Sequence, residues 1–216
     1  MGRTADVFDV GPGRVLRRYK LDGYEASYEA RVMRHVFEQG YPVPQVFAAD
    51  GPDLVMERVT GPTMLKVLLR QPWRAHQLGG VLADMLQQLH LIEAPSWMPD
   101  SLGPGDAVLH LDLHLSNVIM TKRGPVVIDW RNARRGAAMA DVANTWLVLA
   151  TAGRFGQAWW AAGVRSALLR SFLRSFPAEE LRSQLPAVAS LRALDTGVEP
   201  KDRVAAARLL QRLGCE

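Results

Sequence analysis

The spacing of hydrophobic positions along the chain predicts two differently built parts. Alternating runs of hydrophobic and polar residues, separated by Gly, Pro and Asp turns, predict short strands over residues 5–10, 14–19, 45–48 and 53–56. Between the second and third strands, residues 24–39 have the spacing of an amphipathic helix that ends near Gly40. The first 57 residues therefore predict the element order β-β-α-β-β.

The remainder of the chain has mainly helical spacing. Helices are predicted over residues 64–69 and 73–91 and over most of the chain beyond 138. The turn at Gly61-Pro62 suggests a hinge, because no Ser/Gly-rich linker separates the two parts. We therefore expect an α+β protein with a small β-rich lobe over residues 1–57 and a mainly helical lobe over 58–216.

Composition and cysteine content favour an intracellular globular protein. Hydrophobic residues make up 48% of the 216 positions and charged residues 22%, which is enough to build a sizeable core. The single cysteine, Cys215, excludes an internal disulfide and a cysteine-rich metal site, as expected in a reducing compartment. The N-terminal residues lack the apolar core of a signal peptide. We expect a cytoplasmic protein without a membrane span.

The positive charge is not arranged as nucleic-acid-binding proteins require. The net charge is +4, but the basic side chains are scattered and form no dense run with interleaved aromatic residues. Residues 1–141 are balanced, whereas residues 142–216 carry 10 basic and 6 acidic side chains. Nucleic acid is therefore not an expected partner.

The segment HLDLHLSNVIMTKRGPVVIDW, from His110 to Trp130, carries the candidate chemistry. Two β-rich runs flank a three-residue loop at 122–124, and this loop would place Asn117 opposite Asp129, with Cβ atoms roughly 4.5–5.5 Å apart. An amide oxygen and a carboxylate suit Mg²⁺, which keeps waters and substrate phosphates as its other ligands. Asp112, five residues before Asn117, could then accept a proton from a hydroxyl near the transferred phosphate.

This arrangement resembles the motifs of a known family. The spacing His110-x-Asp112-x₄-Asn117, followed by Ile128-Asp129-Trp130, is similar to the catalytic and metal loops of the aminoglycoside phosphotransferase family and of choline kinase-like enzymes. The resemblance implies a protein kinase-like two-lobed fold with a reduced N-terminal lobe. It also implies transfer of the terminal phosphate of ATP to a hydroxyl of a small molecule. In that scheme Asp112 is the catalytic base, His110 supports its loop, and Asn117 and Asp129 bind Mg²⁺.

The resemblance extends to the nucleotide site expected in residues 1–57. Arg17 matches the phosphate-binding basic residue of the second strand, and Glu29 matches its acidic partner on the following helix. The segment 54–59 resembles the hinge between lobes, whose backbone at Glu57 and Val59 would bind adenine. Gly2-Arg3-Thr4-Ala5 would form the phosphate-covering loop. Farther along the chain, Asp141 matches the aspartate that follows the metal loop in this family, and the resemblance implies that it braces the catalytic loop.

Two other functions are compatible with the same residues. If His110, Asp112 and His114 lay on one strand, they would point the same way and could bind zinc in a hydrolase. A nucleotide-binding pseudokinase without transfer activity is the other alternative. The acceptor and the oligomeric state stay open, although the basic excess after residue 141 favours a neutral or anionic acceptor over a polycation.

Overall fold

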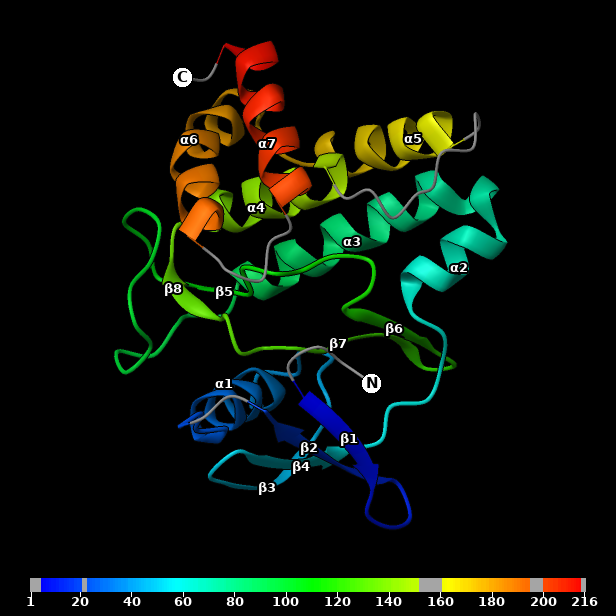
Figure 1. Cartoon of the computed structure of the whole chain (residues 1–216), viewed down its shortest axis with the longest axis vertical. Coiled ribbons are helices and arrows are strands. Elements are labelled where there is room, and N and C mark those ends of the chain that lie inside the picture. Colours follow the sequence, from blue (N-terminus) through cyan, green and yellow to red (C-terminus); the bar gives the residue numbers. More distant parts are fainter. Residues whose placement is uncertain (1–4, 21–22, 152–160, 195–199, 215–216) are drawn as a thin grey trace.

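The computed structural model describes residues 5–20, 23–151, 161–194 and 200–214. Cys215 and the expected phosphate-covering residues Gly2 to Thr4 lie outside these ranges. Figure 1 shows a small β-rich part at one end of the molecule and a larger helical part at the other. The predicted α+β class and the two-lobed arrangement with a reduced N-terminal lobe are confirmed.

The small lobe has the predicted element order. Its strands form one antiparallel sheet in the order β1-β2-β4-β3: β1 (Ala5–Asp9), β2 (Arg14–Tyr19), β3 (Val46–Asp50) and β4 (Asp53–Glu57). The helix α1 (Ser27–Glu38) packs beside β3 and buries its apolar stripe, which includes Ala30, Val32, Met33 and Val36. The small lobe thus presents one continuous sheet, with β2 as one of its two central strands.

The connection between the lobes is held tightly at Gly61. A Cβ atom at this position would lie 2.2 Å from the carbonyl oxygen of Met120, so the close approach requires glycine. The carbonyl oxygen of Pro62, the next residue, accepts a hydrogen bond of 2.8 Å from the Met120 amide. The predicted hinge therefore lies against the segment that carries the candidate metal ligands.

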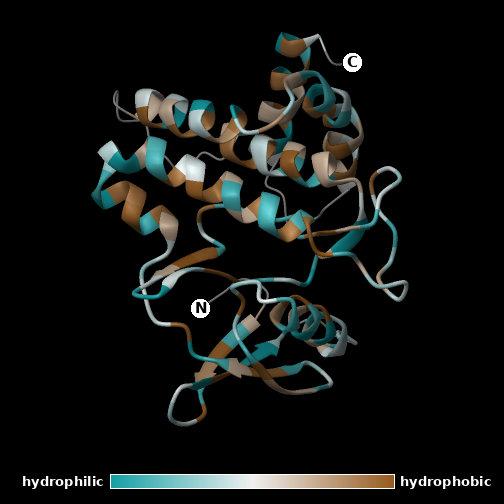
Figure 2. Cartoon of the chain, turned by 180° about the vertical axis from the view of Figure 1, so that it is seen from behind, coloured by the Kyte–Doolittle hydropathy of each residue, from teal (hydrophilic) through white to brown (hydrophobic). Residues whose placement is uncertain are grey.

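The large lobe is built from stacked helices. These are α2 (Met64–Arg70), the short 3₁₀ helix η1 (Pro72–Arg74), α3 (Ala75–His90), α4 (Ala138–Thr151), α5 (Ala161–Leu173), α6 (Ala178–Leu194) and α7 (Pro200–Leu213). The helix α3 packs against α5, and α4 packs against α6. Figure 2 shows hydrophobic and hydrophilic residues alternating around these helices, as expected when one face of each is buried. Within the described ranges, every helix is too short or too polar to cross a membrane.

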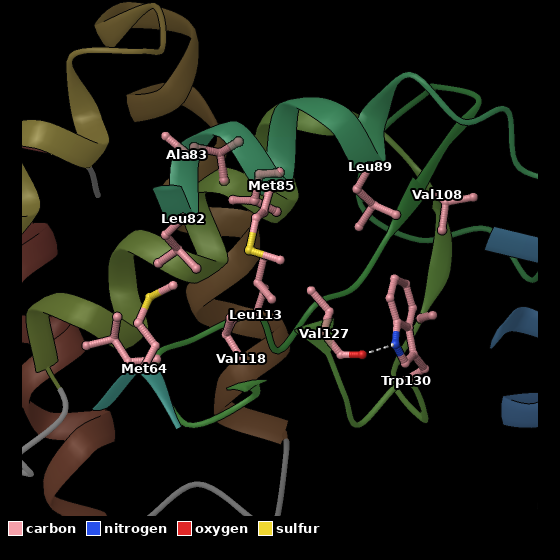
Figure 3. Packing of buried hydrophobic residues seen from close by; sticks show 14 of the residues in the cluster. Met64, Leu82, Ala83, Met85, Leu89, Val108, Leu113, Val118, Val127 and Trp130 are labelled. Atoms are coloured by element: carbon pink, nitrogen blue, oxygen red, sulfur yellow. Dashed lines mark hydrogen bonds between the residues drawn. The ribbon is translucent and has the colours of Figure 1, made fainter. Parts of the chain in front are cut away.

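Two short sheets lie between the helices and the small lobe. The strand β5 (Ala107–Leu109) pairs with β8 (Arg134–Gly136), and β6 (Val118–Thr121) pairs with β7 (Gly124–Val127). Figure 3 shows how side chains of this region pack with those of α3 in one core, with Met85 beside Leu113 and Val118 beside Leu113. The segments that flank the candidate site are therefore fixed to the large lobe by apolar packing.

The hairpin register differs from the prediction. Thr121 pairs with Gly124, so the loop contains two residues instead of three, and the register is shifted by one. Two-residue turns are the favoured hairpin connections. Gly124, which follows the turn, has a φ of 127°, a conformation that glycine adopts readily and other residues rarely adopt. The prediction that Asn117 and Asp129 are directly opposed is therefore wrong.

The contact between α3 and α5 leads to a stability prediction. A Cβ atom at Gly79 would lie 2.3 Å from the Leu168 carbonyl oxygen, whereas one at Gly80 would meet only the Ser171 Oγ atom, at 3.6 Å. We expect Gly79→Ala to lower the free energy of unfolding by about 1–3 kcal/mol, because the backbones of α3 and α5 must move apart to make room for the methyl group. The matched variant Gly80→Ala should be neutral or stabilising by up to about 1 kcal/mol through helix propensity. Urea denaturation checks both, and equal effects would contradict this account of the packing.

Candidate active site

The loop between β5 and β6 is shaped by one buried carboxylate. Asp141, in the first turn of α4, accepts hydrogen bonds from the backbone amides of His110, at 2.7 Å, and Leu111, at 2.8 Å. Its Oδ2 atom also lies 3.2 Å from Nε2 of His90, at the end of α3. Burial by itself would raise the pKa of the Asp141 carboxyl, but the contact with His90 and the hydrogen bond from the His110 amide hold it below its ordinary value. Asp141 is thus an ionised brace, as the resemblance implied.

Leu111 has an unusual backbone conformation at the centre of this brace. Its φ of 57° lies in the left-handed region, which costs an ordinary L-residue about 1–2 kcal/mol. Both of its peptide groups are satisfied, since its amide donates to Asp141 and its carbonyl oxygen accepts a 2.6 Å hydrogen bond from Asn144 Nδ2. The neighbouring Thr145 hydroxyl donates to the carbonyl oxygen of Leu113 at 2.9 Å. The α4 helix therefore holds the loop in a conformation that it would not adopt alone.

The tight turn directs Asp112 toward Asn117. The Asn117 Nδ2 atom donates to the backbone oxygen of Asp112 at 2.9 Å and to its Oδ2 atom at 3.2 Å. Because the amide nitrogen is used in this way, the Asn117 Oδ1 atom is the group left to accept a bond or bind a cation. The Asp112 side chain keeps 25% of its surface exposed, so a substrate can reach it.

His110 links this loop to the following one. Its ring is buried against Trp130, with ring centroids 4.7 Å apart. The Nδ1 atom accepts the Asp112 amide at 3.2 Å, and this contact assigns the proton to Nε2, which lies 3.2 Å from the carbonyl oxygen of Ile128. The Ile128 amide donates in turn to the Asn117 carbonyl oxygen at 3.0 Å. Both polar backbone groups of Ile128 are thus held by the catalytic loop, immediately before Asp129.

Asp129 points from this loop toward the small lobe. It also has a left-handed backbone, with φ 70°, and its Oδ1 atom accepts a hydrogen bond of 2.8 Å from Arg17 on β2. The guanidinium of Arg131 approaches the same oxygen to 4.0 Å. Burial opposes the charge of Asp129, but Arg17 and then Arg131 outweigh it and lower the pKa of the carboxyl. Asp129 is therefore an anionic oxygen donor.

Arg17 is held between two carboxylates that come from different parts of the chain. Besides Asp129, it contacts Glu29 on α1, with its NH1 atom 3.2 Å from Oε1. Glu29 is fully buried and also accepts hydrogen bonds from the Tyr19 hydroxyl and, at 3.0 Å, from the Trp130 amide. Burial raises the pKa of the Glu29 carboxyl, while the charge of Arg17 and the hydrogen bond from Tyr19 oppose that rise. The Arg17–Glu29 pair predicted from the sequence is present.

The two arginines of β2 face opposite ways, as strand alternation predicted. Only 12% of the Arg17 side chain is exposed, whereas 55% of Arg18 is exposed, and Arg18 pairs with Asp53 at 2.6 Å on the outer side.

At the end of β4, the Glu57 amide donates to the Gln45 carbonyl oxygen, and the Glu57 carboxylate contacts Arg123. Glu57 and Val59 therefore lie at the junction of the lobes, and their contact with adenine stays a prediction.

The zinc alternative does not fit the arrangement of the histidines. The strand β5 ends at Leu109, and the left-handed turn at Leu111 breaks the alternation that would have pointed His110, Asp112 and His114 in one direction. Both ring nitrogens of His110 already have protein partners. No three His, Cys, Asp or Glu side chains of the described ranges gather as a metal site. A zinc hydrolase is therefore not favoured.

Sequence reasoning missed the polar side chains of α4 and α3 that support the loop. Asn144 and Thr145 bond to loop carbonyl oxygens, and His90 supports Asp141. A signal was present, since Asp141, Asn144 and Thr145 are spaced i, i+3 and i+4 in an otherwise apolar helix, which places them on one face. Three buried polar residues on one helical face indicate a polar neighbour, here the catalytic loop.

Fold and site together define a protein kinase-like phosphotransferase. Arg17 of β2 pairs with Glu29 of α1 and contacts Asp129. The preceding loop presents Asp112, which is held by Asn117. The chain belongs to the phosphotransferase enzyme family, whose sequence model matches residues 68–185, more than half of its length. The predicted family and the predicted class of enzyme, a small-molecule kinase that uses ATP, are thereby confirmed.

Solved structures with the same fold include aminoglycoside and choline or ethanolamine kinases. Aminoglycoside phosphotransferase APH(4)-Ia has a TM-score of 0.68 and 18% identity, with 100% of this chain and 91% of that chain covered. A thermostable mutant of it, in a ternary complex with AMP-PNP and hygromycin B, has a TM-score of 0.68 and 17% identity, with the same coverage. A choline/ethanolamine kinase family protein from Mesorhizobium loti has a TM-score of 0.65 and 16% identity, over 99% of this chain and 85% of that one. A search of curated proteins finds no match.

The brace leads to a prediction about acid stability. In Asp141→Asn, the amides of His110 and Leu111 lose a charged acceptor, so we expect the free energy of unfolding at pH 7 to fall by at least about 2 kcal/mol. Because the pKa of Asp141 is lowered by folding, its stabilisation is present above the ordinary aspartate pKa of about 3.9 and is lost as the pH falls below it. The difference between wild type and variant should therefore shrink below about pH 4.

Urea denaturation from pH 3 to pH 7 measures this difference. Asp106→Asn is the control, because Asp106 lies on the surface with Arg135, and exposed pairs contribute little. A constant difference between wild type and Asp141→Asn across the pH range would contradict the assignment of a charged brace.

Proposed function

We propose that this phosphotransferase uses ATP with Mg²⁺, and that Asp112 accepts the proton of the attacking hydroxyl of a small-molecule acceptor. The observation that carries the proposal is the double hydrogen bonding of Ile128, whose amide binds the Asn117 carbonyl oxygen and whose carbonyl oxygen faces His110 Nε2. These two contacts tie Asp129 to the loop of Asp112 and Asn117. Loops tied in this way suit phosphoryl transfer, which depends on positioning and on charge stabilisation.

Asp112 is the proposed proton acceptor. Its carboxylate is partly exposed and is oriented by Asn117, so an acceptor hydroxyl can approach it in one defined direction. The acceptor oxygen forms a bond to the terminal phosphorus, and the bond from that phosphorus to the bridging oxygen of ADP breaks. The hydroxyl proton passes to Asp112. His110 lies too deep to touch substrate, and we assign it to holding the loop.

The donor set fits a magnesium site. Asn117 offers its Oδ1 atom, because its nitrogen is engaged by Asp112, and Asp129 offers an anionic carboxylate. When bound there, Mg²⁺ would neutralise charge on the nucleotide phosphates. Arg17 lies beside Asp129 and is the proposed contact for phosphate oxygens, with Glu29 fixing the direction of its guanidinium.

Nucleotide and acceptor are proposed to bind on opposite sides of this centre. Residues 1–57 would bind ATP, with adenine on the backbone of Glu57 and Val59, and residues 58–216 would supply the acceptor site. The Glu57 amide is already used by Gln45, which makes the Val59 amide the candidate donor to adenine. The need for ATP and the single cysteine favour a cytoplasmic location. The intact Asp112, Asn117 and Asp129 argue against a pseudokinase.

Asp112→Asn is the direct test of the mechanism. The amide keeps the size of the carboxylate but cannot accept a proton, so we expect ADP formation with a hydroxyl acceptor to fall by about 10²–10⁴-fold. Binding of AMP-PNP with Mg²⁺ should change little, because Asp112 is assigned to the acceptor. A coupled ADP assay and calorimetry measure the two properties. The wild-type reaction should stop in EDTA and recover with added Mg²⁺, and near-normal turnover by Asp112→Asn would refute the assignment.

Arg17 and Arg18 provide a matched test of the phosphate site. Arg17→Gln should raise the apparent KM for ATP by about tenfold or more, since it removes a guanidinium that faces Asp129. Arg18→Gln removes an equal charge from the exposed face of the same strand and should leave the KM for ATP unchanged. Steady-state kinetics at saturating acceptor compare them. Equal increases would show that net charge, and not a phosphate contact, sets the affinity for ATP.

A further inference from the structure

A pocket lies next to the catalytic loop at Leu111. Its volume is about 280 Å³, and it is bounded by residues after the metal loop, by α4 and by the C-terminal part of α6. Figure 1 shows α6 above β8 in this region. Ligand pockets commonly start near 300 Å³, so this one suits a small molecule or one group of a larger molecule.

The pocket is directly connected to the catalytic loop. Leu111, which lines it, is the residue before Asp112. Asn144, which also lines it, holds the Leu111 carbonyl oxygen with its Nδ2 atom. A molecule in this pocket therefore contacts Leu111, one residue before the proposed catalytic base, in the part of the chain where the acceptor is expected.

The described lining of the pocket carries positive charge and no negative charge. Arg134 and Arg192 line it, and its lining contains no acidic residue. The NH1 atom of Arg134 donates to the Ala133 carbonyl oxygen at 2.8 Å, and that of Arg192 donates to Asn144 Oδ1 at 3.0 Å. Neither guanidinium forms an ion pair with a carboxylate of the described ranges, although both are partly buried.

Other arginines near the site are neutralised. Arg17 contacts two carboxylates, and Arg135, adjacent to Arg134 on β8, pairs with Asp106 and Asp100. Arg134 also lies over the Tyr28 ring, with 5.6 Å between its guanidinium carbon and the ring centroid, but this contact supplies no negative charge. Removing a charge from water without an anionic partner is costly, so two partly buried guanidinium groups around one cavity favour a ligand that supplies the negative charge. Guanidinium groups bind carboxylates and phosphates in a two-pronged geometry.

We infer that the acceptor is a small hydroxy compound with an anionic group, a carboxylate or a phosphate, which Arg134 and Arg192 bind in this pocket. The inference rests on the proposed function, because it takes Asp112 as the catalytic base. Binding of the anionic group at Arg134 and Arg192 leaves the hydroxyl of the same molecule to reach Asp112. The same positive charge disfavours polycationic acceptors, since like charges reduce both encounter rate and affinity.

The first experiment compares acceptors that differ in charge. ADP formation is measured with gluconate and glucose, with glycerate, glycerol phosphate and glycerol, and with kanamycin as a polycation. We expect kcat/KM to be at least about tenfold higher for gluconate than for glucose, and for glycerate or glycerol phosphate than for glycerol, as one charge-assisted contact provides. Preference for gluconate and glycerate indicates a carboxylate site, and preference for glycerol phosphate indicates a phosphate site. Faster turnover of kanamycin or of the neutral compounds would overturn the inference.

The second experiment tests the two arginines by binding, without turnover. Calorimetric titration with the same anions should show affinity about tenfold or more lower in Arg134→Gln and in Arg192→Gln, and partial recovery in the two Lys variants. Arg135→Gln is the matched control, because it removes an equal charge from the adjacent position outside the pocket. Melting temperatures identify variants that fail to fold, and the Lys variants then decide the result.

The outcomes separate this inference from the proposed function. Binding of an anion that depends on Arg134 and Arg192 supports the inference even if Asp112→Asn keeps its activity, a result that would refute only the proposed mechanism. Loss of activity in Asp112→Asn together with anion affinity no greater than that of the neutral compounds would overturn the inference and leave the phosphotransferase mechanism in place. Equal losses of affinity in Arg135→Gln and in the pocket variants would also overturn it.

Discussion

The geometry of the active site depends on the buried carboxylate of Asp141. It binds two successive backbone amides of the catalytic loop and is supported by His90 from α3. With Asn144, it stabilises the left-handed conformation of Leu111. The turn at Leu111 determines where Asp112 points. The buried carboxylate of Asp141 thus maintains the direction of the partly exposed Asp112 carboxylate. The free-energy cost of removing Asp141 from water falls on the helical lobe.

A second carboxylate, Glu29, fixes the small lobe to this centre. It accepts hydrogen bonds from Arg17 and Tyr19 of the sheet and from the backbone of Trp130, the residue after Asp129. Glu29, a side chain of α1, therefore connects Arg17 of the sheet with the loop that carries Asp129. This explains how the described sheet β1-β2-β4-β3 and the helix α1 can hold Arg17 in place: its alignment depends on a buried polar cluster more than on the extent of the sheet.

Much of the site could be predicted from local sequence patterns. Strand alternation placed Arg17 inward and Arg18 outward, and the family resemblance implied that Glu29 and Asp141 are partners of distant segments. The errors arose where a single residue changed the backbone path. A two-residue turn, in place of a three-residue one, shifted the β6–β7 register, and Asn117 therefore bonds to the backbone of Ile128 instead of facing Asp129. The left-handed turn at Leu111 invalidated the extended path assumed for His110 to His114.

The sequence by itself determined the order of elements and the family, and it predicted the residues of the reaction centre, because each depends on local spacing and on motifs only a few residues long. Only the tertiary structure decided which charges share one environment. Arg134 and Arg192 are 58 positions apart and have no sequence signature, yet they line one pocket. Arg135 has the same side chain as its neighbour but is paired on the surface. Whether an arginine is neutralised or available to a ligand depends on its partners in space, and hydrophobic packing of distant helices and strands selects those partners.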